Sequence, residues 1–228
     1  SRDFQDAADA YQEAFLGVSG TLSDEAMATQ LVQQYLSDEL GRLYAEKYFS
    51  EEAKADVEDM VYDFIDIYKD HIRSLGWMSD TTKAKAIEKL DALGVKVGYP
   101  DEGKWNDYFK GVTLKTADEG GSYFDNIITM MKAQEQMLIE WQNRPVNKDL
   151  WPMAAYTVNA CYVPANNEIV FPAGILQAPL YDVSASREEN LGGIGYVIAH
   201  EITHAFDNNG AKYDRDGNAA DWWTAEDY

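Results

Sequence analysis

The stretch VIAHEITHAF, residues 197 to 206, contains two of the three histidines of the chain, four residues apart, with a glutamate directly after the first. On an α-helix, residues four apart lie one turn above each other on the same face. His200 and His204 can therefore both reach one metal ion, at the distance of about 2.0 to 2.1 Å typical of a zinc–nitrogen bond. Glu201 points about 100° round the helix from His200, near the ion but not forced to coordinate it. This spacing is typical of a hydrolytic zinc site.

In such a site, zinc polarises the scissile carbonyl group and lowers the pKa of a zinc-bound water molecule. Glu201 is then the general base, which takes the proton of that water and passes it to the leaving amine. The alternative is that His200 and His204 are hydrogen-bonded core histidines of a buried helix. We favour that alternative for the isolated His71, whereas the pair with its glutamate favours a metal site.

Two histidines do not complete a zinc site, which needs a third protein ligand. One class of zinc protease has a glycine and a histidine three and six residues after the second motif histidine, but Asp207 and Gly210 stand there. Another class takes a glutamate from a later helix. Glu226 is the only glutamate after the motif, and it could coordinate only if a tight turn followed the motif helix.

The composition narrows the class of protein. The chain has 228 residues, of which 46% are hydrophobic, which is enough for one large globular domain or two smaller ones. Its 40 acidic residues against 19 lysines and arginines give a net charge of −21. We therefore expect no binding to nucleic acid, because such a surface repels phosphate groups. The chain has no apolar run of about 18 residues, so we expect no membrane contact from this segment.

The hydrophobic periodicity predicts helices in the first part of the chain. We expect them at about residues 23 to 44, 50 to 75, 79 to 94 and 123 to 141, the third ending at Gly94 because glycine favours helix C-termini. The predicted apolar face of the fourth helix is formed by Ile127, Ile128, Met131, Met137, Leu138 and Trp141. Between residues 98 and 121 the pattern breaks into a long connection.

After residue 147 the sequence becomes typical of β-strands. Residues 156–163 and 168–171 are rich in β-forming residues, and the sequence PANN between them is typical of a turn, so they predict a hairpin. We therefore expect a mainly helical α+β protein: a helical region over residues 1–145, followed by a region over residues 146–228 that carries the hairpin and the motif helix.

At this point the residues resemble a known family, the neprilysin-like zinc metallopeptidases, which include endothelin-converting enzymes and bacterial oligopeptidases of the O type. The resemblance rests on residues 159–162 (NACY), 167–177 (NEIVFPAGILQ), 192–195 (GGIG), 200–207 (HEITHAFD), 216–218 (DGN) and 221–224 (DWWT). Weaker similarity, at residues 41–44 (GRLY) and 98–100 (GYP), extends upstream. The resemblance implies that residues 146–228 are the N-terminal part of a thermolysin-like zincin catalytic domain.

The resemblance also implies roles for individual residues. His200 and His204 bind Zn²⁺, Glu201 is the general base, and Asp207 is a carboxylate beside the ligand histidines. The substrate-binding positions are Asn159 and Ala160, which pair with the peptide backbone, and Ile175, Leu180, Tyr196 and Val197, which line the pocket for an apolar side chain after the scissile bond. Cys161, Leu180 and Ala199 stand where the family usually has an aromatic residue, phenylalanine and glycine, so the pocket shape can differ.

The expected function is that of a zinc-dependent metalloendopeptidase, which cleaves oligopeptides on the amino side of apolar residues. In the family, the third ligand comes from a later Glu-x-x-x-Asp motif, and a transition-state-stabilising histidine and a substrate-binding arginine follow. None of these is present, so we expect an inactive internal fragment whose parent chain supplies the third ligand. The single cysteine suits a bacterial member, for which we expect a cytoplasmic location, with an exported form as the alternative.

Other functions fit the residues less well. A non-catalytic peptide-binding module with a vestigial metal site would keep the strand edge and the pocket but not the turnover. A structural zinc protein needs four protein ligands, which the scarcity of cysteine and histidine argues against. An aminopeptidase would carry a Gly-x-Met-Glu-Asn stretch, which is absent. Residues 214–218 (DRDGN) resemble part of a calcium loop but lack its final glutamate, so they predict a turn.

Overall fold

The computed structural model describes residues 2–17, 23–106, 108–109 and 111–228, which form two compact units divided after Ser37. The first unit contains helices α1 (Arg2–Leu16) and α2 (Asp24–Tyr35). Ser23 begins α2 as expected for a capping residue, because its side chain accepts a hydrogen bond from the backbone N–H of Ala26. No residue of α2 is buried.

The second unit carries the remaining elements, apart from Ser37 at the start of α3. In chain order these are α3 (Ser37–Tyr48), α4 (Glu51–Ser74), α5 (Asp80–Asp91), β1 (Gly94–Gly98), a 3₁₀ turn (Ala117–Glu119), α6 (Tyr123–Trp141), β2 (Cys161–Val163), β3 (Glu168–Pro172), α7 (Arg187–Gly192), α8 (Ile194–Thr203) and a second 3₁₀ turn (Gly210–Lys212). A mainly helical α+β fold is therefore confirmed. Among the described residues, no helix is both long and apolar enough to cross a bilayer.

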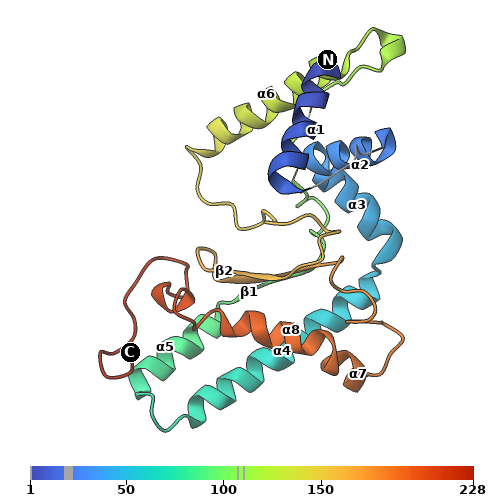
Figure 1. The fold of residues 1–228 in the computed structure, drawn as a ribbon. Coiled ribbons are helices and arrows are strands. Elements are labelled where there is room, and N and C mark those ends of the chain that lie inside the picture. Colours follow the sequence, from blue (N-terminus) through green and yellow to red (C-terminus); the bar gives the residue numbers. More distant parts are fainter. Residues whose placement is uncertain (1, 18–22, 107, 110) are drawn as a thin grey trace. The chain divides into compact units, whose positions relative to one another are not determined.

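The sheet has three strands in the order β1-β3-β2. Strand β1 runs parallel to β3, and β2 runs antiparallel to it, with Tyr162 opposite Ile169. All five residues of the central strand β3 are buried. Helices α4, α5 and α8 lie on one side of this sheet (Figure 1), where α4 contacts β1 and α8 contacts β2. The predicted hairpin is confirmed as β2 and β3, although its first strand covers only Cys161–Val163 and not the predicted residues 156–163.

The main core lies between the sheet and these helices. Helix α4 contributes an apolar stripe to this core, in which Val57, Met60 and Val61 are fully buried. Ile198 and Ile202 supply the matching face of α8 and are also fully buried. A polar contact adds to this packing, since the hydroxyl group of Tyr68 on α4 donates to the carbonyl group of Ala199 at 2.9 Å. The motif helix is thus fixed along its length against α4.

Two helix boundaries differ from the prediction. A single helix over residues 23 to 44 is wrong, because α2 ends at Tyr35 and α3 begins at Ser37, where a serine and two acidic residues form a second helix-start signal. Gly94 does not end α5, which stops at Asp91, but begins β1. A side chain at Gly94 would meet the Glu168 Cβ at 2.9 Å, so the strand pairing requires glycine there.

The bounds of α6 are confirmed, and four residues of its predicted apolar face, Ile127, Ile128, Met137 and Trp141, are half-buried. Met130 is its one buried residue, whereas Met131 and Leu138 are 51% and 54% exposed. The periodicity of a helix identifies an apolar face, but it does not reveal whether another element covers that face.

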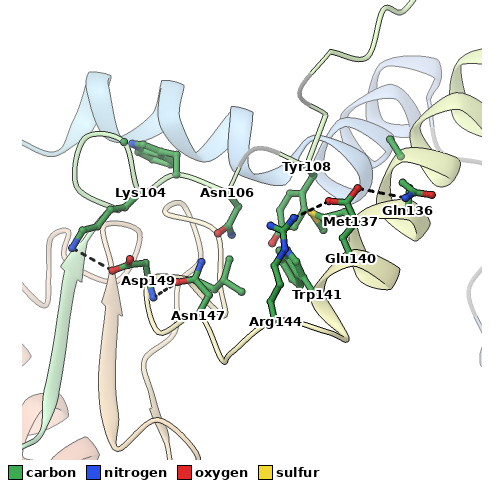
Figure 2. A pocket seen from close by; sticks show the side chains of 14 residues that line it. Lys104, Asn106, Tyr108, Gln136, Met137, Glu140, Trp141, Arg144, Asn147 and Asp149 are labelled. Atoms are coloured by element: carbon green, nitrogen blue, oxygen red, sulfur yellow. Dashed lines mark hydrogen bonds and ion pairs between the residues drawn. The ribbon is translucent and has the colours of Figure 1, made fainter.

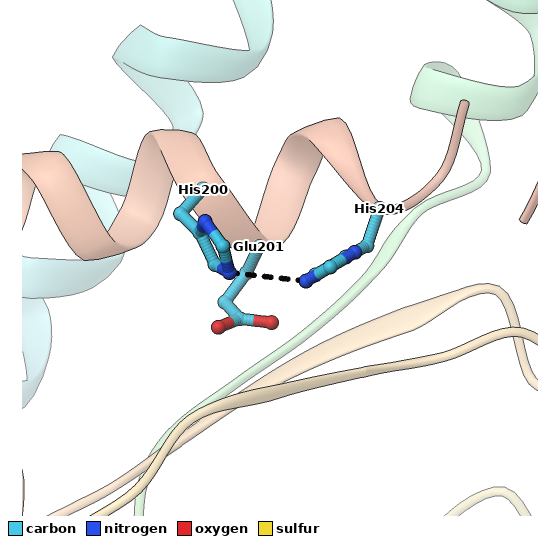
Figure 3. A group of neighbouring side chains, drawn as sticks. All are labelled: His200, Glu201 and His204. Carbon is cyan, nitrogen blue, oxygen red and sulfur yellow. Dashed lines mark hydrogen bonds between the residues drawn. The ribbon is translucent and has the colours of Figure 1, made fainter. Parts of the chain in front are cut away.

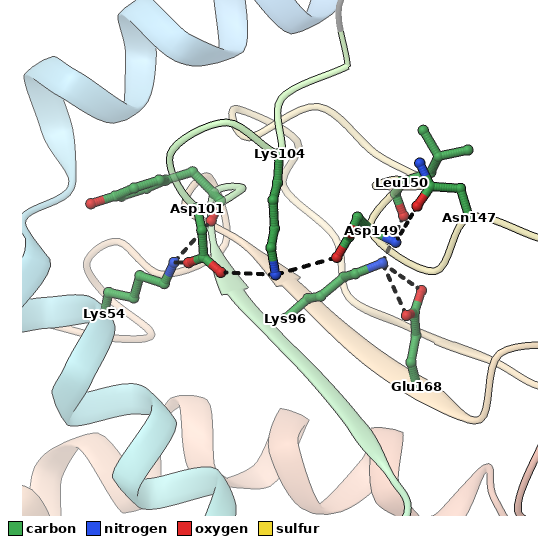
Figure 4. Close-up of polar contacts among 9 residues, drawn as sticks. Lys54, Lys96, Asp101, Lys104, Asn147, Asp149, Leu150 and Glu168 are labelled. Atoms are coloured by element: carbon green, nitrogen blue, oxygen red, sulfur yellow. Dashed lines mark hydrogen bonds and ion pairs between the residues drawn. The ribbon is translucent and has the colours of Figure 1, made fainter.

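The expectation of a helical region up to residue 145 does not hold for β1. This strand lies before residue 145 in the sequence and pairs with β3, which lies after it. Polar contacts reinforce this pairing (Figure 4). The ammonium group of Lys96 on β1 forms a 2.9 Å ion pair with Glu168 on β3 and donates to the carbonyl group of Leu150 at 2.6 Å. Segments from both sides of residue 145 therefore share one sheet and one core.

Candidate metal centre

Helix α8 presents the two motif histidines and Glu201 on one side (Figure 3). His204 is the residue after the last helical one, and its backbone angles of −62° and −20° continue the helical path. The two imidazole rings therefore lie one turn apart, with their Nε2 atoms 3.1 Å from each other. One ligand atom from each of His200, Glu201 and His204 lies within 4.8 Å of the other two.

This donor set fits a zinc ion. Two nitrogen ligands at about 2.0 to 2.1 Å from a tetrahedral ion are about 3.3 Å apart, close to the observed Nε2–Nε2 distance. Imidazole nitrogen is also a preferred zinc ligand. His200 and His204 are therefore placed to hold zinc with little rearrangement.

Asp207 holds His204 in the orientation that metal binding requires. Its Oδ2 atom lies 2.7 Å from the Nδ1 atom of His204, and a carboxylate there assigns the proton to Nδ1. The Nε2 atom then carries the lone pair that faces His200 and the metal position. The prediction that Asp207 lies beside a ligand histidine agrees with this contact.

The loop after α8 fixes Asp207 in turn. The backbone N–H groups of Asn209 and Gly210 both donate to its Oδ1 atom at 2.8 Å. Although burial by itself would raise the pKa of Asp207, the hydrogen bonds from Gly210, His204 and Asn209 lower the pKa below its ordinary value. Asp207 thus stays ionised and accepts three hydrogen bonds at neutral pH.

Glu201 lies in a different environment from the histidines. Its side chain is buried, whereas His200 is exposed and His204 is half-buried. Burial raises the pKa of Glu201, and the nearby His204 and His200 together with a hydrogen bond from the backbone of Tyr162 oppose this effect. A carboxylate with a raised pKa is a better proton acceptor than an ordinary one, as a general base requires.

A cleft of about 360 Å³ opens over the motif. Its lining includes the motif residues and Asp207, and also two predicted substrate-binding residues, Asn159 and Ala160. Asn159 is exposed and Ala160 is buried, and both directly precede β2. Because β2 is an edge strand in the described sheet, its outer edge is open to an added strand. The structure therefore brings six of the ten predicted site residues together.

The four predicted pocket residues do not line this cleft. Ile175 belongs to the core, and Leu180 and Val197 are half-buried against it. Tyr196 is 75% exposed on α8. The backbone of Leu180 supports the start of α8, since its carbonyl group accepts from the N–H of Ile194 at 2.8 Å. An apolar substrate pocket at these positions stays a prediction.

Glu226 does not join the metal cluster, which comprises only the three motif residues among those described. Its neighbour Asp227 holds the end of the chain against the start of α5 instead. The Asp227 carboxylate accepts hydrogen bonds from the backbone N–H of Ser79 at 3.0 Å and from the hydroxyl group of Thr224 at 2.8 Å. Within the described residues, the site therefore offers two histidine ligands and a base.

Sequence reasoning missed two buried residues near the site, Lys89 and Asn167. Lys89 lies on the buried face of α5, between Ala86 and Leu90, and this position of a lysine among apolar residues could have revealed it. Asn167 adopts a φ of 50° at the end of the hairpin turn, a conformation that asparagine tolerates. The turn sequence PANN does not reveal which of its two asparagines, Asn166 or Asn167, is buried.

Other predicted features have no part in metal binding. Residues 214–218 form the predicted turn, in which the Asp214 side chain accepts from the backbone N–H groups of Asp216 and Asn218. Cys161 is half-buried, and burial followed by the charge of Glu201 raises the pKa of its thiol. A raised thiol pKa disfavours the thiolate and so a nucleophilic role.

A larger cavity of about 580 Å³ lies between α6 and the segments around residues 105 and 148 (Figure 2). Its charged groups pair with each other, Arg144 with Glu140 and Lys104 with Asp149, both at 3.3 Å. None of the predicted site residues lines it.

Comparison with known families agrees with the site. Two sequence models, both described as Peptidase family M13, match residues 1–100 and residues 159–228. The chain is 41% identical to a neutral endopeptidase of Lactobacillus helveticus over all 228 residues, and 36% identical to human neprilysin over 227 residues. It spans 34% of the length of the former and 30% of the latter. The chain belongs to peptidase family M13.

Solved structures agree with the fold. PepO from Lactobacillus rhamnosis superposes with a TM-score of 0.86 at 36% identity, over 95% of this chain and 34% of that one. The zinc metalloprotease Zmp1 of Mycobacterium tuberculosis, in complex with an inhibitor, gives a TM-score of 0.82 at 37% identity over 95% of this chain and 32% of that one. The expected relationship to neprilysin-like zinc metallopeptidases is thus confirmed.

Proposed function

We propose that these residues form part of the active site of a zinc-dependent endopeptidase that cleaves oligopeptides. The observation that carries the proposal is the pair of Nε2 atoms 3.1 Å apart, with one ring held by Asp207 and the buried Glu201 beside them. Relatives named neutral endopeptidase and neprilysin support it.

Each residue has a distinct task in this proposal. A bound zinc ion would supply Lewis-acid polarisation of the scissile carbonyl group and of water. His200 and His204 hold that ion through Nε2, and Asp207 keeps His204 in the binding orientation. Glu201 takes a proton from the attacking water and passes it to the nitrogen of the leaving amine, which completes hydrolysis of the peptide bond.

The substrate in this proposal is an extended peptide. The open edge of β2 can pair with a peptide backbone, which would lie along Asn159 and Ala160 and pass over the motif. We propose that Ile175, Leu180, Tyr196 and Val197 select an apolar residue after the scissile bond once the rest of the site is complete.

The third zinc ligand in this proposal comes from outside residues 1–228. Two histidines leave the coordination of zinc incomplete, and Glu226 is absent from the metal cluster of the described residues. The chain spans only about a third of the length of its endopeptidase relatives. We therefore expect residues 1–228 alone to be inactive.

Peptide hydrolysis by the whole parent chain tests the proposal. Glu201→Gln should lower kcat by roughly 10² to 10⁴-fold, because general-base catalysis contributes about that much. Its zinc content should remain unchanged, since both histidines are retained. Glu188→Gln, at an exposed position on α7, is the matched control and should keep full activity.

The same experiment separates two other outcomes. Hydrolysis unchanged by Glu201→Gln would rule out the proposed mechanism. Peptide binding without turnover in the unaltered parent chain would instead support a non-catalytic peptide-binding module.

A further inference from the structure

Lys89 is a buried lysine on the concealed face of α5. Lys89 is only 1% exposed, and its side chain is among the most deeply buried large side chains in the described structure. Its ammonium group donates to the backbone carbonyl groups of Gly210 and Tyr213, both at 2.6 Å. The rings of Tyr162 and Trp222 lie 5.7 and 5.6 Å from it. Two carbonyl groups and two aromatic rings thus surround one ammonium group. Three of these contacts come from the segment after α8, and the fourth comes from β2.

Burying an ammonium group is costly unless it is well hydrogen-bonded. Burial lowers the pKa of Lys89 to about 8, against the opposing charges of Asp214 and Asp207. A methionine or leucine would fill the same space on the apolar face of α5 without this cost. The contacts of the ammonium group therefore point to a specific task.

One path of contacts leads from Lys89 to the metal ligand His204. The peptide groups of Gly210 carry it: the carbonyl group of Gly210 accepts from Lys89, and its N–H group donates to Oδ1 of Asp207 at 2.8 Å. The other oxygen of Asp207 lies 2.7 Å from Nδ1 of His204. Lys89 is thus two residues removed from the imidazole that would bind zinc.

A second path leads from Lys89 to the base Glu201. The ring of Tyr162 lies near the ammonium group, and the backbone of Tyr162 bonds to Glu201. The hydroxyl group of Tyr162 donates to Asn167 at 3.1 Å, and the amide group of Asn167 donates to the backbone carbonyl group of Lys89 at 2.9 Å. The side chain and the backbone of Lys89 therefore both support the strand beside Glu201.

From these contacts we infer that Lys89 is a positioning residue of the metal centre, which holds the loop after α8 so that Asp207 orients His204. The inference rests on the proposed zinc site. In this inference α5 supports the metal centre. Lys89 lies in residues 1–100, which match one family model, and the motif lies in residues 159–228, which match the other.

The test measures the imidazole tautomer of His204 in the metal-free chain, which can be read without enzymatic activity. Residues 1–228 are labelled with ¹⁵N, and the spectra of the three histidines are recorded near pH 7.5, where an ordinary histidine is mostly neutral. His204 should hold its proton on Nδ1 in the unaltered chain. Lys89→Met should give a mixture of the two tautomers at His204, while His71 stays unchanged as the internal reference.

Lys96→Met is the matched control. Lys96 is also shielded from solvent, with 13% of its side chain exposed, and donates to a backbone carbonyl group at 2.6 Å, but it lies on β1 and contacts Glu168 and Leu150 (Figure 4). It should leave the tautomer of His204 unchanged. Zinc affinity of the parent chain gives a second measurement, and Lys89→Met should weaken it by about tenfold, as loss of a ligand-orienting partner does.

An Asp207→Ala background tests the path itself. In a chain that already carries Asp207→Ala, adding Lys89→Met should not change the zinc affinity further, because the effect of Lys89 on His204 passes through Asp207. If Lys89→Met does not fold, Lys89→Gln, whose shorter side chain cannot donate to both the Gly210 and Tyr213 carbonyl groups, is measured by the same spectra and should give the same mixture of tautomers. A tautomer and an affinity that match those of Lys96→Met would overturn the inference while the proposed zinc site stands. Failure of the unaltered parent chain to bind zinc would instead overturn the proposed function, and the spectra would still decide the role of Lys89.

Discussion

Gly210 determines how tightly the chain can turn after the motif helix. A Cβ atom at this position would lie 1.9 Å from the carbonyl oxygen of His204, far inside a van der Waals contact. The tight approach places the Gly210 N–H on Asp207 and its carbonyl group on Lys89. The same glycine that excludes one class of zinc protease at the sequence level is therefore required by the loop that supports His204.

Gly210→Ala should open this loop. We expect the free energy of unfolding to fall by about 2 kcal/mol, within the usual range for a single substitution that forces a backbone shift, and the Nδ1 proton of His204 to become less strongly localised. Urea unfolding of residues 1–228 measures the first effect. Gly192→Ala is the control, because a Cβ there meets no atom within 4 Å. Equal stability of the two variants would contradict this account of the loop.

At the scale of elements, the start of α5 depends on a contact from the far end of the chain. Ser79 caps α5 by accepting from the backbone N–H of Thr82, while its own N–H donates to Asp227 at 3.0 Å. The hydrogen bonds from Ser79, Thr82 and Thr224 lower the pKa of Asp227. The helix that carries Lys89 is thus held at its first turn by the C-terminal segment.

This contact predicts a pH dependence of stability. Because the pKa of Asp227 is lower in the folded chain than in the unfolded one, its contribution is complete above the unfolded value of about 3.9 and is lost as the pH falls below it. Asp227→Asn should therefore be less stable than the unaltered chain at pH 7, with a difference that shrinks towards pH 3. Urea unfolding at several pH values measures it, and a difference independent of pH would argue against an ionised Asp227.

Local signals explain which elements could be predicted. The bounds of α4 and α6 follow from Ser50 and Ser122 at their N-caps and from long periodic stretches. Strand β1 could not be predicted in this way, because its five residues, GVKVG, are too few for a clear strand signal and form a strand by pairing with β3. The break between α2 and α3 carries a start signal at Ser37, but the apolar spacing continues across it and favours one long helix.

At the scale of the whole molecule, zinc titration tests whether the site is complete. Calorimetry of residues 1–228 should show weak binding, because two histidines supply only part of the coordination, and His204→Ala should abolish it. The whole parent chain should bind one zinc ion tightly. Tight binding by residues 1–228 that disappears in His204→Ala would mean instead that the third ligand lies within this chain.

The sequence by itself determined the local chemistry of this protein. The four-residue spacing of His200 and His204, with Glu201 between them, predicts a metal site because a helix places such residues on one face. The turn sequence and β-forming residues predict the hairpin, and the further motifs indicate the family. These features depend on residues close in the chain, and so they can be derived from the order of residues alone.

Only the tertiary structure decided what supports that chemistry. Lys89 precedes Gly210 by 121 residues, and β1 precedes its partner strand β3 by about 70, so neither contact leaves a periodic signal in the sequence. The structure also decided that Asn159 and Ala160 share a cleft with the motif. The physical reason is that burial and pairing arise from packing between distant segments, whereas spacing along a helix is local.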